Sequence, residues 1–128
     1  MRDLASNIAV VTALSPAVQA ATIKGVAVDT KGYGSCAFVL NTGAIASAGD
    51  FGAKLQESDT TTDGDFSDVD DDDLVGAFDA TASADAAEKV SYIGHKRYAR
   101  LVLTKAGGTS IAAGAIAILD RAAERPVS

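Results

Sequence analysis

Alternating apolar and polar residues predict that this chain is built mainly from β-strands. The clearest stretch is residues 97–105, where Ala99, Leu101 and Leu103 are expected to face one side. Alternation with a period of two is typical of a half-buried strand, whereas a helix would need apolar residues at three- and four-residue steps. We expect this segment to be the central strand of a β-sandwich. Residues 90–93 are expected to form another strand, or an earlier part of the same one that is broken at Gly94.

Shorter runs of the same kind predict the remaining strands. They fall at residues 8–14, 21–29, 35–45, 51–58, 74–78 and 110–119. The first run is expected to end at Pro16, and a short helix over residues 4–14 is the alternative there. The segments 31–34 and 106–109 predict turns, and residues 81–88 predict a linker or a helical turn. Seven to eight short strands separated by turns indicate an all-β protein, a single-domain β-sandwich of the jelly-roll kind.

The length of 128 residues fits one domain, residues 1–128. Within it we expect an extended arm at residues 1–7, an acidic loop at residues 59–73 and a charged tail at residues 121–128. The lone cysteine, Cys36, has no partner for an internal disulfide and lies in an apolar run. We therefore expect it to be a small core residue rather than a reactive thiol, with Phe38 close by as a large core residue.

The charged residues are unevenly distributed along the chain. Thirteen of the seventeen carboxylates fall between Asp50 and Glu88, while five of the eleven Lys and Arg residues fall between Lys89 and Lys105. This predicts two surfaces of opposite sign that would steer and align neighbouring proteins, with an ordinary solvated loop beside the strand as the alternative. The net charge of −6 argues against nucleic-acid binding. No apolar run is long enough to cross a membrane as a helix.

The acidic loop matches part of a calcium-binding pattern, with glycine at its sixth position. The residues that would hold the ion are Asp59, Thr61, Asp63, Asp65, Ser67 and Asp70. Calcium prefers six to eight hard oxygen ligands, which this set could offer. The match is weakened by Asp in place of Glu at the last position, by Thr61, and by flanks that look like strands rather than helices. We therefore expect no cofactor and keep calcium as the alternative.

No combination of residues predicts a catalytic centre. His95 is the single histidine, so a histidine metal cluster is excluded, and its neighbours Lys96 and Arg97 indicate a surface position. Ser35 and Cys36 have no identifiable base nearby in the sequence. We expect a protein that is not an enzyme.

Several segments carry a resemblance to a known family. They are residues 1–7, 32–33, 41–45, 55–59, 92–98, 100–105 and 110–114. Together they resemble small proteins encoded in the head-gene region of tailed phages, prophages and phage-like particles, close to the major capsid protein gene. The similarity extends over nearly the whole chain. It implies a structural protein of the virion, at the capsid surface, with the major capsid protein as its partner and a homo-oligomeric state.

Within that family we expect a head decoration (cement) protein, and a neck or tail component is the alternative. The residues expected to bind partners are Arg2, Asp3, Leu4, Lys96, Arg97 and Arg100. The first three belong to the arm, which could add a strand to a neighbour's sheet. The last three could pair with acidic capsid surface or with the acidic loop of an adjacent copy.

A second resemblance concerns the order of residues 55–59, 66–69 and 97–101. It is similar to jelly-roll sugar-binding modules of the discoidin kind, so a glycan-binding module is a further alternative. The chain has no tryptophan, although sugar sites usually need exposed aromatic residues.

Overall fold

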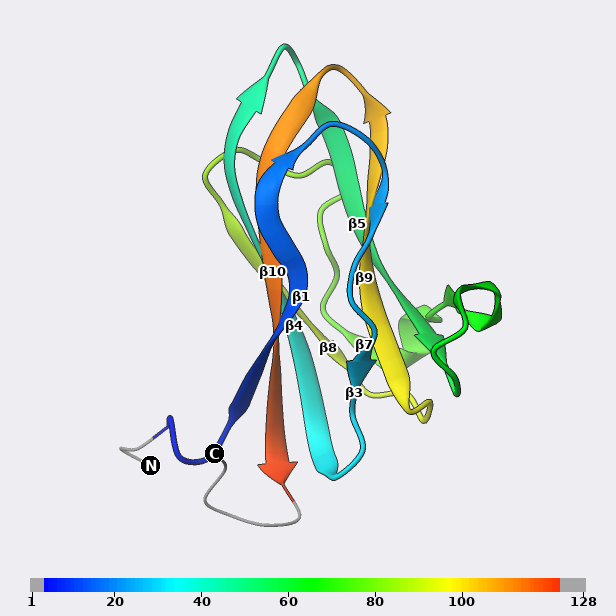
Figure 1. Ribbon diagram of the computed structural model, residues 1–128. Helices are drawn as coiled ribbons and strands as arrows, with labels where there is room; N and C mark the ends of the chain where they lie inside the picture. The colour runs from blue at the N-terminus through cyan, green and yellow to red at the C-terminus, as the bar shows by residue number, and fades with distance from the viewer. Residues whose placement is uncertain (1–3, 123–128) are drawn as a thin grey trace.

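The computed structural model describes residues 4–122 and shows two antiparallel sheets packed face to face (Figure 1). The first sheet has the strand order β1 (Ala9–Gln19), β10 (Ser110–Ala122), β4 (Tyr33–Ala46), β8 (Ala87–Tyr92) and β7 (Leu74–Val75). The second has the order β2 (Ile23–Lys24), β9 (Tyr98–Gly107), β5 (Asp50–Ser58) and β6 (Ser67–Asp68), with β3 (Val28–Asp29) also paired to β9. Two short 3-10 turns, η1 (Asp63–Asp65) and η2 (Asp71–Asp73), lie between β5 and β7. The predicted all-β sandwich is confirmed.

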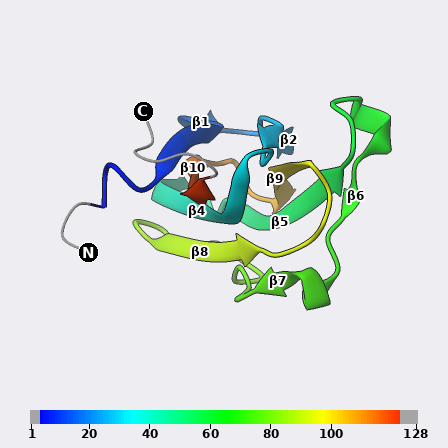
Figure 2. The same ribbon diagram turned by 90° about the horizontal axis from the view of Figure 1, so that it is seen from below.

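The order of the strands is that of a jelly roll. When β2 and β3 are taken as one strand and β7 as an addition beside β8, eight strands remain. One of them, β6, lies within the segment 59–73 that was predicted to be a loop, while the predicted strand at 74–78 is the short β7. Numbered along the chain, they run 1-8-3-6 in the first sheet and 2-7-4-5 in the second. Chain neighbours therefore alternate between the sheets for much of the chain, and the two layers are tied together at both ends (Figure 2).

The core lies between the sheets and is filled by every second residue of the long strands. Phe38 and Leu40 of β4, Phe51 of β5 and Leu101 and Leu103 of β9 are buried completely or almost completely. Strand β10 contributes small side chains at its inward positions, which lets the two sheets approach closely. Cys36 belongs to the same core, where burial raises the pKa of its thiol to about 12. Its predicted role as a small core residue is confirmed.

Strand β1 differs from the prediction, because it continues through Pro16 to Gln19. The register against β10 shifts between Thr12 and Leu14 and again between Leu14 and Ala17. Proline is tolerated in an edge strand at such a bulge because no neighbour there needs its missing N–H group. The alternative of a helix over residues 4–14 is wrong.

The segment 21–29 was predicted to be one strand and is interrupted, whereas the predicted linker at 81–88 is found. Residues 21–29 form two short strands separated at Gly25, whose backbone N–H donates to the carbonyl of Leu101 while the N–H of Val26 donates to the carbonyl of Ala13. The connection between β2 and β3 is therefore hydrogen-bonded to both sheets, although both of its strands pair with β9 in the second sheet. Residues 81–88 are mostly loop, and β8 begins at Ala87. Within residues 4–122 there is no helix long and apolar enough to cross a lipid bilayer.

Candidate interaction surfaces

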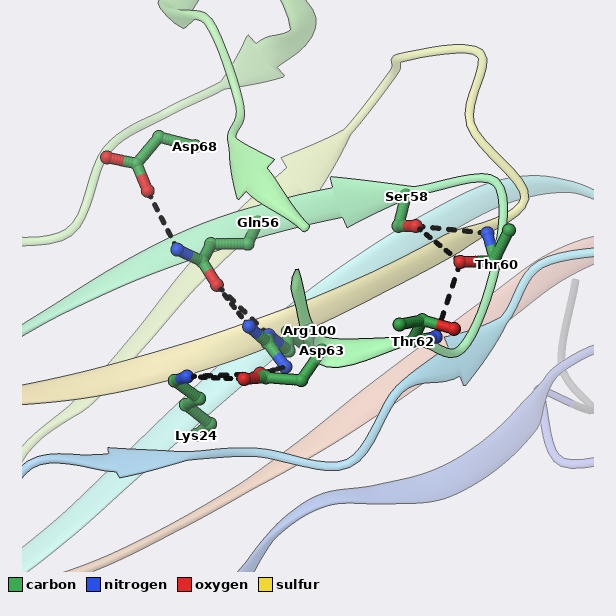
Figure 3. Close-up of polar contacts among 8 residues, drawn as sticks. All are labelled: Lys24, Gln56, Ser58, Thr60, Thr62, Asp63, Asp68 and Arg100. Atoms are coloured by element: carbon green, nitrogen blue, oxygen red, sulfur yellow. Dashed lines mark hydrogen bonds and ion pairs between the residues drawn. The ribbon is translucent and has the colours of Figure 1, made fainter. Parts of the chain in front are cut away.

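The acidic loop folds back onto the outer face of the second sheet, where Asp63 meets Arg100 of β9 (Figure 3). Nη1 of Arg100 donates to Oδ1 of Asp63 at 2.7 Å, and Nζ of Lys24 reaches the other carboxylate oxygen at 2.9 Å. On its other side the guanidinium donates to Oε1 of Gln56 through Nε at 3.0 Å and Nη2 at 2.7 Å. Gln56 in turn donates to Asp68 at 3.0 Å. The acidic loop is thus bound to the second sheet at two places, Asp63 in η1 and Asp68 in β6.

A ring contact completes this site. The guanidinium carbon of Arg100 lies 4.0 Å from the centre of the Phe66 ring. The Arg100 side chain is only 8% exposed, whereas that of Asp63 is 61% exposed. A cation enclosed between a ring, an amide and a carboxylate is well compensated for its lost hydration. The loop therefore has a defined place on the sheet.

The base of the acidic loop is ordered by hydroxyl groups. Oγ of Ser58 accepts the backbone N–H of Thr60 at 3.0 Å, and Oγ1 of Thr60 accepts the N–H of Thr62 at 3.3 Å (Figure 3). The same Thr60 hydroxyl donates to Asp65 at 2.6 Å. These local bonds fix the turn that leads from β5 into η1.

The other two cations expected to bind partners are also paired within their own chain. Nζ of Lys96 lies 2.9 Å from Oδ2 of Asp59. Arg97 donates two hydrogen bonds to the carboxylate of Asp29, from Nε at 3.0 Å and from Nη2 at 2.8 Å. The basic strand and the acidic loop therefore meet inside one molecule. Of the predicted arm residues, Leu4 is 57% exposed, and Arg2 and Asp3 lie outside the described residues.

The ion pairs shift the titration of their carboxylates. The hydrogen bond from Arg97 lowers the pKa of Asp29 to about 2. The pKa of Asp63 is lowered by the bonds from Lys24 and Arg100, and the pKa of Asp68 by those from Gln56 and Lys54. On the cation side, the bond to Asp59 raises the pKa of Lys96. Each shift favours the charged form of its group, as expected for an ion pair.

The calcium pattern fits these surroundings poorly. Asp59 and Asp63 are already neutralised by lysine and arginine, and Asp65 accepts from Thr60. Thr61, Ser67 and Asp70 are exposed, and Ser67 lies in β6, where it pairs with Glu57 of β5. Within the described part of the chain, no three His, Cys, Asp or Glu side chains gather in a way that could hold a metal ion.

A second surface lies on the opposite side of the molecule, on the outer face of the first sheet. Strands β1 and β4 and residues 110–119 of β10 contain no charged residue. We call their outward side the neutral face. Its side chains are Val10, Thr12, Pro16, Val18, Ala37, Val39, Asn41, Ala112, Ile116 and Ile118, with Gly114 among them. Part of it is a shallow groove of about 800 Å³.

The exposed apolar side chains gather on this side. Eight large hydrophobic residues are exposed among those described, and they are Leu4, Val10, Val11, Val18, Val26, Val75, Ile93 and Ile116. Val10, Val18 and Ile116 lie on the neutral face, and Val75 of β7 lies on the same side of the sheet. Leu4 and Ile93 line a second groove of about 610 Å³ against β4, whereas Val11 shares a row with the buried Ala117 and Val26 lies in the β2–β3 connection. Apolar groups concentrated on one face mark a surface that another molecule covers.

Packing between β1 and β10 keeps the neutral face smooth. A Cβ atom at Gly114 would lie 2.9 Å from both Cα and Cβ of Pro16. Only glycine at position 114 leaves room for Pro16 to pack against β10. The bulged part of β1 therefore belongs to the neutral face. The sequence contained this signal, because three long segments without a charged residue, 9–19, 33–46 and 110–119, are visible in it, but sequence reasoning did not identify it.

One end of the sandwich collects the remaining predicted contacts. The start of β1, the β3–β4 turn and the loop between β8 and β9 lie at the lower end in Figure 1. His95, in the loop between β8 and β9, is exposed.

Comparison with known proteins gives little further information. No family model matches the chain, and no curated protein matches it. A solved structure of infectious bursal disease virus, Gx strain, contains a chain that is similar to this one with 14% identity and a TM-score of 0.48. The match covers 93% of this chain and 34% of that one, so the chain spans about a third of the length of the chain it matches.

Proposed function

We propose that this chain is a non-catalytic structural protein of a tailed phage or phage-like particle, and that it decorates the outer surface of the head. The observation that carries the proposal is the neutral face, where β1, β4 and residues 110–119 of β10 lie side by side without a charged residue and present exposed valine and isoleucine side chains. Such a face is suited to contact with other proteins rather than to chemistry on a small substrate.

The fold and the sequence resemblance support the same conclusion. Jelly rolls are common in viral capsid and lectin domains, although the fold alone does not assign a function. The resemblance to small proteins encoded beside the major capsid protein gene favours the capsid among these possibilities. A stiff sandwich that binds only the assembled shell would stabilise it by mass action.

The loop between β8 and β9, which carries Lys96 and Arg97, is the part we assign to the capsid. Lys96 and Arg97 remain about half exposed despite their intramolecular pairs, with 47% and 45% of each side chain accessible. Exposed ion pairs contribute little to the free energy of folding. Lys96 or Arg97 could therefore leave its intramolecular carboxylate, Asp59 or Asp29, and bind a capsid carboxylate at a small cost in stability. Residues 1–7 could add a strand to the sheet of a capsid subunit.

The test is to add purified chain to particles that lack it and to measure retention on the particles by co-sedimentation. Binding of hundreds of copies over the head surface is the expected result, and deletion of residues 1–7 should weaken it. Around a dozen copies at one vertex would instead indicate a neck or tail component. Binding on a glycan array that depends on Tyr33 or Tyr98, with no retention on particles, would favour the sugar-binding alternative.

A further inference from the structure

Three cations lie close together on the outer face of the second sheet, and we call them the basic patch. They are Lys24 of β2, Lys54 of β5 and Arg100 of β9. Both lysines pair with Val102 of β9, so they form one row across the sheet with Val102 between them. Arg100 lies two residues from Val102 along β9, and residues two apart in a strand share one side of the sheet. Strand register therefore gathers three positive charges that are far apart in the chain.

Every cation of the basic patch is paired with the acidic loop of its own chain (Figure 3). Lys24 and Arg100 both contact Asp63, at 2.9 Å and 2.7 Å. Lys54 contacts Asp68 at 3.0 Å. These are three of the five ion pairs found within residues 4–122. The acidic loop thus covers the basic patch with carboxylates of complementary charge.

The acidic loop contacts the patch in the way that a bound peptide contacts a sheet. After η1 the chain is extended at Phe66, and the next two residues pair with Gln56 and Glu57 of β5 as the short strand β6. Phe66 lies over the guanidinium of Arg100, and two residues later Asp68 accepts a hydrogen bond from Gln56. Addition of a strand to a sheet edge, with side chains in fixed positions, is a recurring mode of peptide recognition.

The contacts that hold the loop are of a kind that can be exchanged. The side chains of Lys24 and Lys54 are 53% and 45% exposed, and those of Asp63 and Asp68 are 61% and 62% exposed. Exposed ion pairs contribute little to stability, and β6 has only two residues. Arg100 is the enclosed member of the patch, so the ring and the carboxylate on it are the main contacts that a competing segment must replace.

We propose that the basic patch is a binding site for an extended acidic segment of another protein, and that the acidic loop occupies it as an autoinhibitory contact. The loop shows the chemistry of the partner: carboxylates in the places of Asp63 and Asp68, with an aromatic ring in the place of Phe66. A tethered segment competes at an effective concentration in the millimolar range, so the loop reduces binding of other segments. The proposal goes beyond the proposed function, since it does not depend on where the chain lies in a particle.

The test is fluorescence anisotropy of a labelled peptide with the sequence of residues 60–70, added to the full chain at low salt. The loop-weakened variant carries Asp63→Asn, Phe66→Ala and Asp68→Asn, and it should bind the peptide at least about tenfold more tightly than wild type. The matched control carries Asp71→Asn and Asp72→Asn, which remove the same two charges from exposed positions in η2. It should bind no more tightly than wild type.

Two further measurements identify the site. Arg100→Met, added to the loop-weakened variant, should abolish binding, and circular dichroism shows whether each variant is folded. In wild type, the unlabelled peptide at millimolar concentration should displace the loop and shift the NMR signals of the Gln56 side-chain amide, which donates to Asp68. This second measurement decides the question if the loop-weakened variant does not fold.

Several outcomes would overturn the inference. They are absence of binding by a folded loop-weakened variant, equal binding by wild type, binding that survives Arg100→Met, and no shift at Gln56 in wild type. A peptide with the three substitutions of the loop-weakened variant should not bind, and binding by it would also contradict the inference. Tighter binding of a single-stranded oligonucleotide than of the peptide would assign the patch to nucleic acid instead. None of these outcomes changes the expected retention of the chain on particles, which tests the proposed function separately.

Discussion

Arg100 and Phe66 are stacked, with the guanidinium carbon 4.0 Å from the centre of the ring. Arg100 lies in β9, an interior strand of the second sheet, and Phe66 lies in the acidic loop. Their contact therefore packs the loop against the sheet. The same guanidinium binds Gln56 and Asp63. One side chain therefore sets the position of the loop on the sheet.

Replacing Arg100 by methionine is expected to release the loop and to lower the free energy of unfolding by about 1–3 kcal/mol, since the stacking and the bonds to Gln56 are lost from a side chain that is 8% exposed. Chemical denaturation measures the loss, and hydrogen exchange should show faster exchange at residues 60–66. Lys54→Met is the control, because Lys54 is 45% exposed and pairs with Asp68 of the same loop. Its effect should be below about 1 kcal/mol. Equal effects of the two variants would contradict the role assigned to Arg100.

The pair formed by Arg97 and Asp29 predicts a dependence of stability on pH. The pKa of Asp29 is about 2 in the folded protein, below its usual 3.8, so its contribution is complete above about pH 4 and is lost as the pH falls toward 2. Arg97→Gln should return the pKa of Asp29 toward 3.8 and reduce stability at neutral pH. Its deficit relative to wild type should shrink between about pH 4 and pH 2. Carbon-detected NMR titration of Asp29 checks the pKa, and a wild-type value near 3.8 would contradict the pair.

Phe38 is expected to be a principal support of the core. It is fully buried in β4, and its partner in the adjacent strand β10 of the same sheet is the small residue Ala117, so its removal would leave a cavity in the core. Phe38→Ala should lower the free energy of unfolding by about 3–5 kcal/mol. Val39→Ala alters the next residue of the same strand on the outward side and should cost below about 1 kcal/mol. Urea unfolding of both variants tests this, and similar midpoints would show that the faces of β4 are wrongly assigned.

Cys36 is expected to be unreactive in the native protein. Burial removes it from solvent and raises the pKa of its thiol to about 12, so little thiolate is present at pH 8. Labelling with a disulfide reagent should be slow in buffer and fast in denaturant. Fast labelling of the folded protein would contradict the position of Cys36 in the core.

Calcium is expected to leave the melting temperature unchanged, because Asp59 and Asp63 are already paired with cations. Differential scanning calorimetry with excess calcium and then with a chelator measures this. A rise in melting temperature that saturates with calcium would show that the loop can rearrange to bind the ion. Asp63→Asn would then be expected to abolish the rise.

Much of the fold could be predicted from the sequence because long strands carry a strong local pattern. The alternation at 97–105 and the apolar run at 35–45 became β9 and β4, both in the interior of their sheets. The prediction that the strand ends at Pro16 was wrong, because proline lacks the N–H group that a strand interior needs but an edge strand at a bulge does not. The two halves of 21–29 were not separated because the break at Gly25 serves contacts to Ala13 and Leu101, which are distant in the chain.

The sequence by itself determined the class of fold, the burial of Cys36 and Phe38, and the separation of acidic residues from uncharged strands, since each depends on residue type and spacing. Only the tertiary structure decided that Arg100 and Lys96 pair with the acidic loop of their own chain, and that β1, β10 and β4 lie side by side. Those facts depend on strand order and register, which bring together residues that local patterns cannot relate. The neutral face exists for the same reason: three uncharged segments, far apart in the chain, become neighbours only when the jelly roll closes.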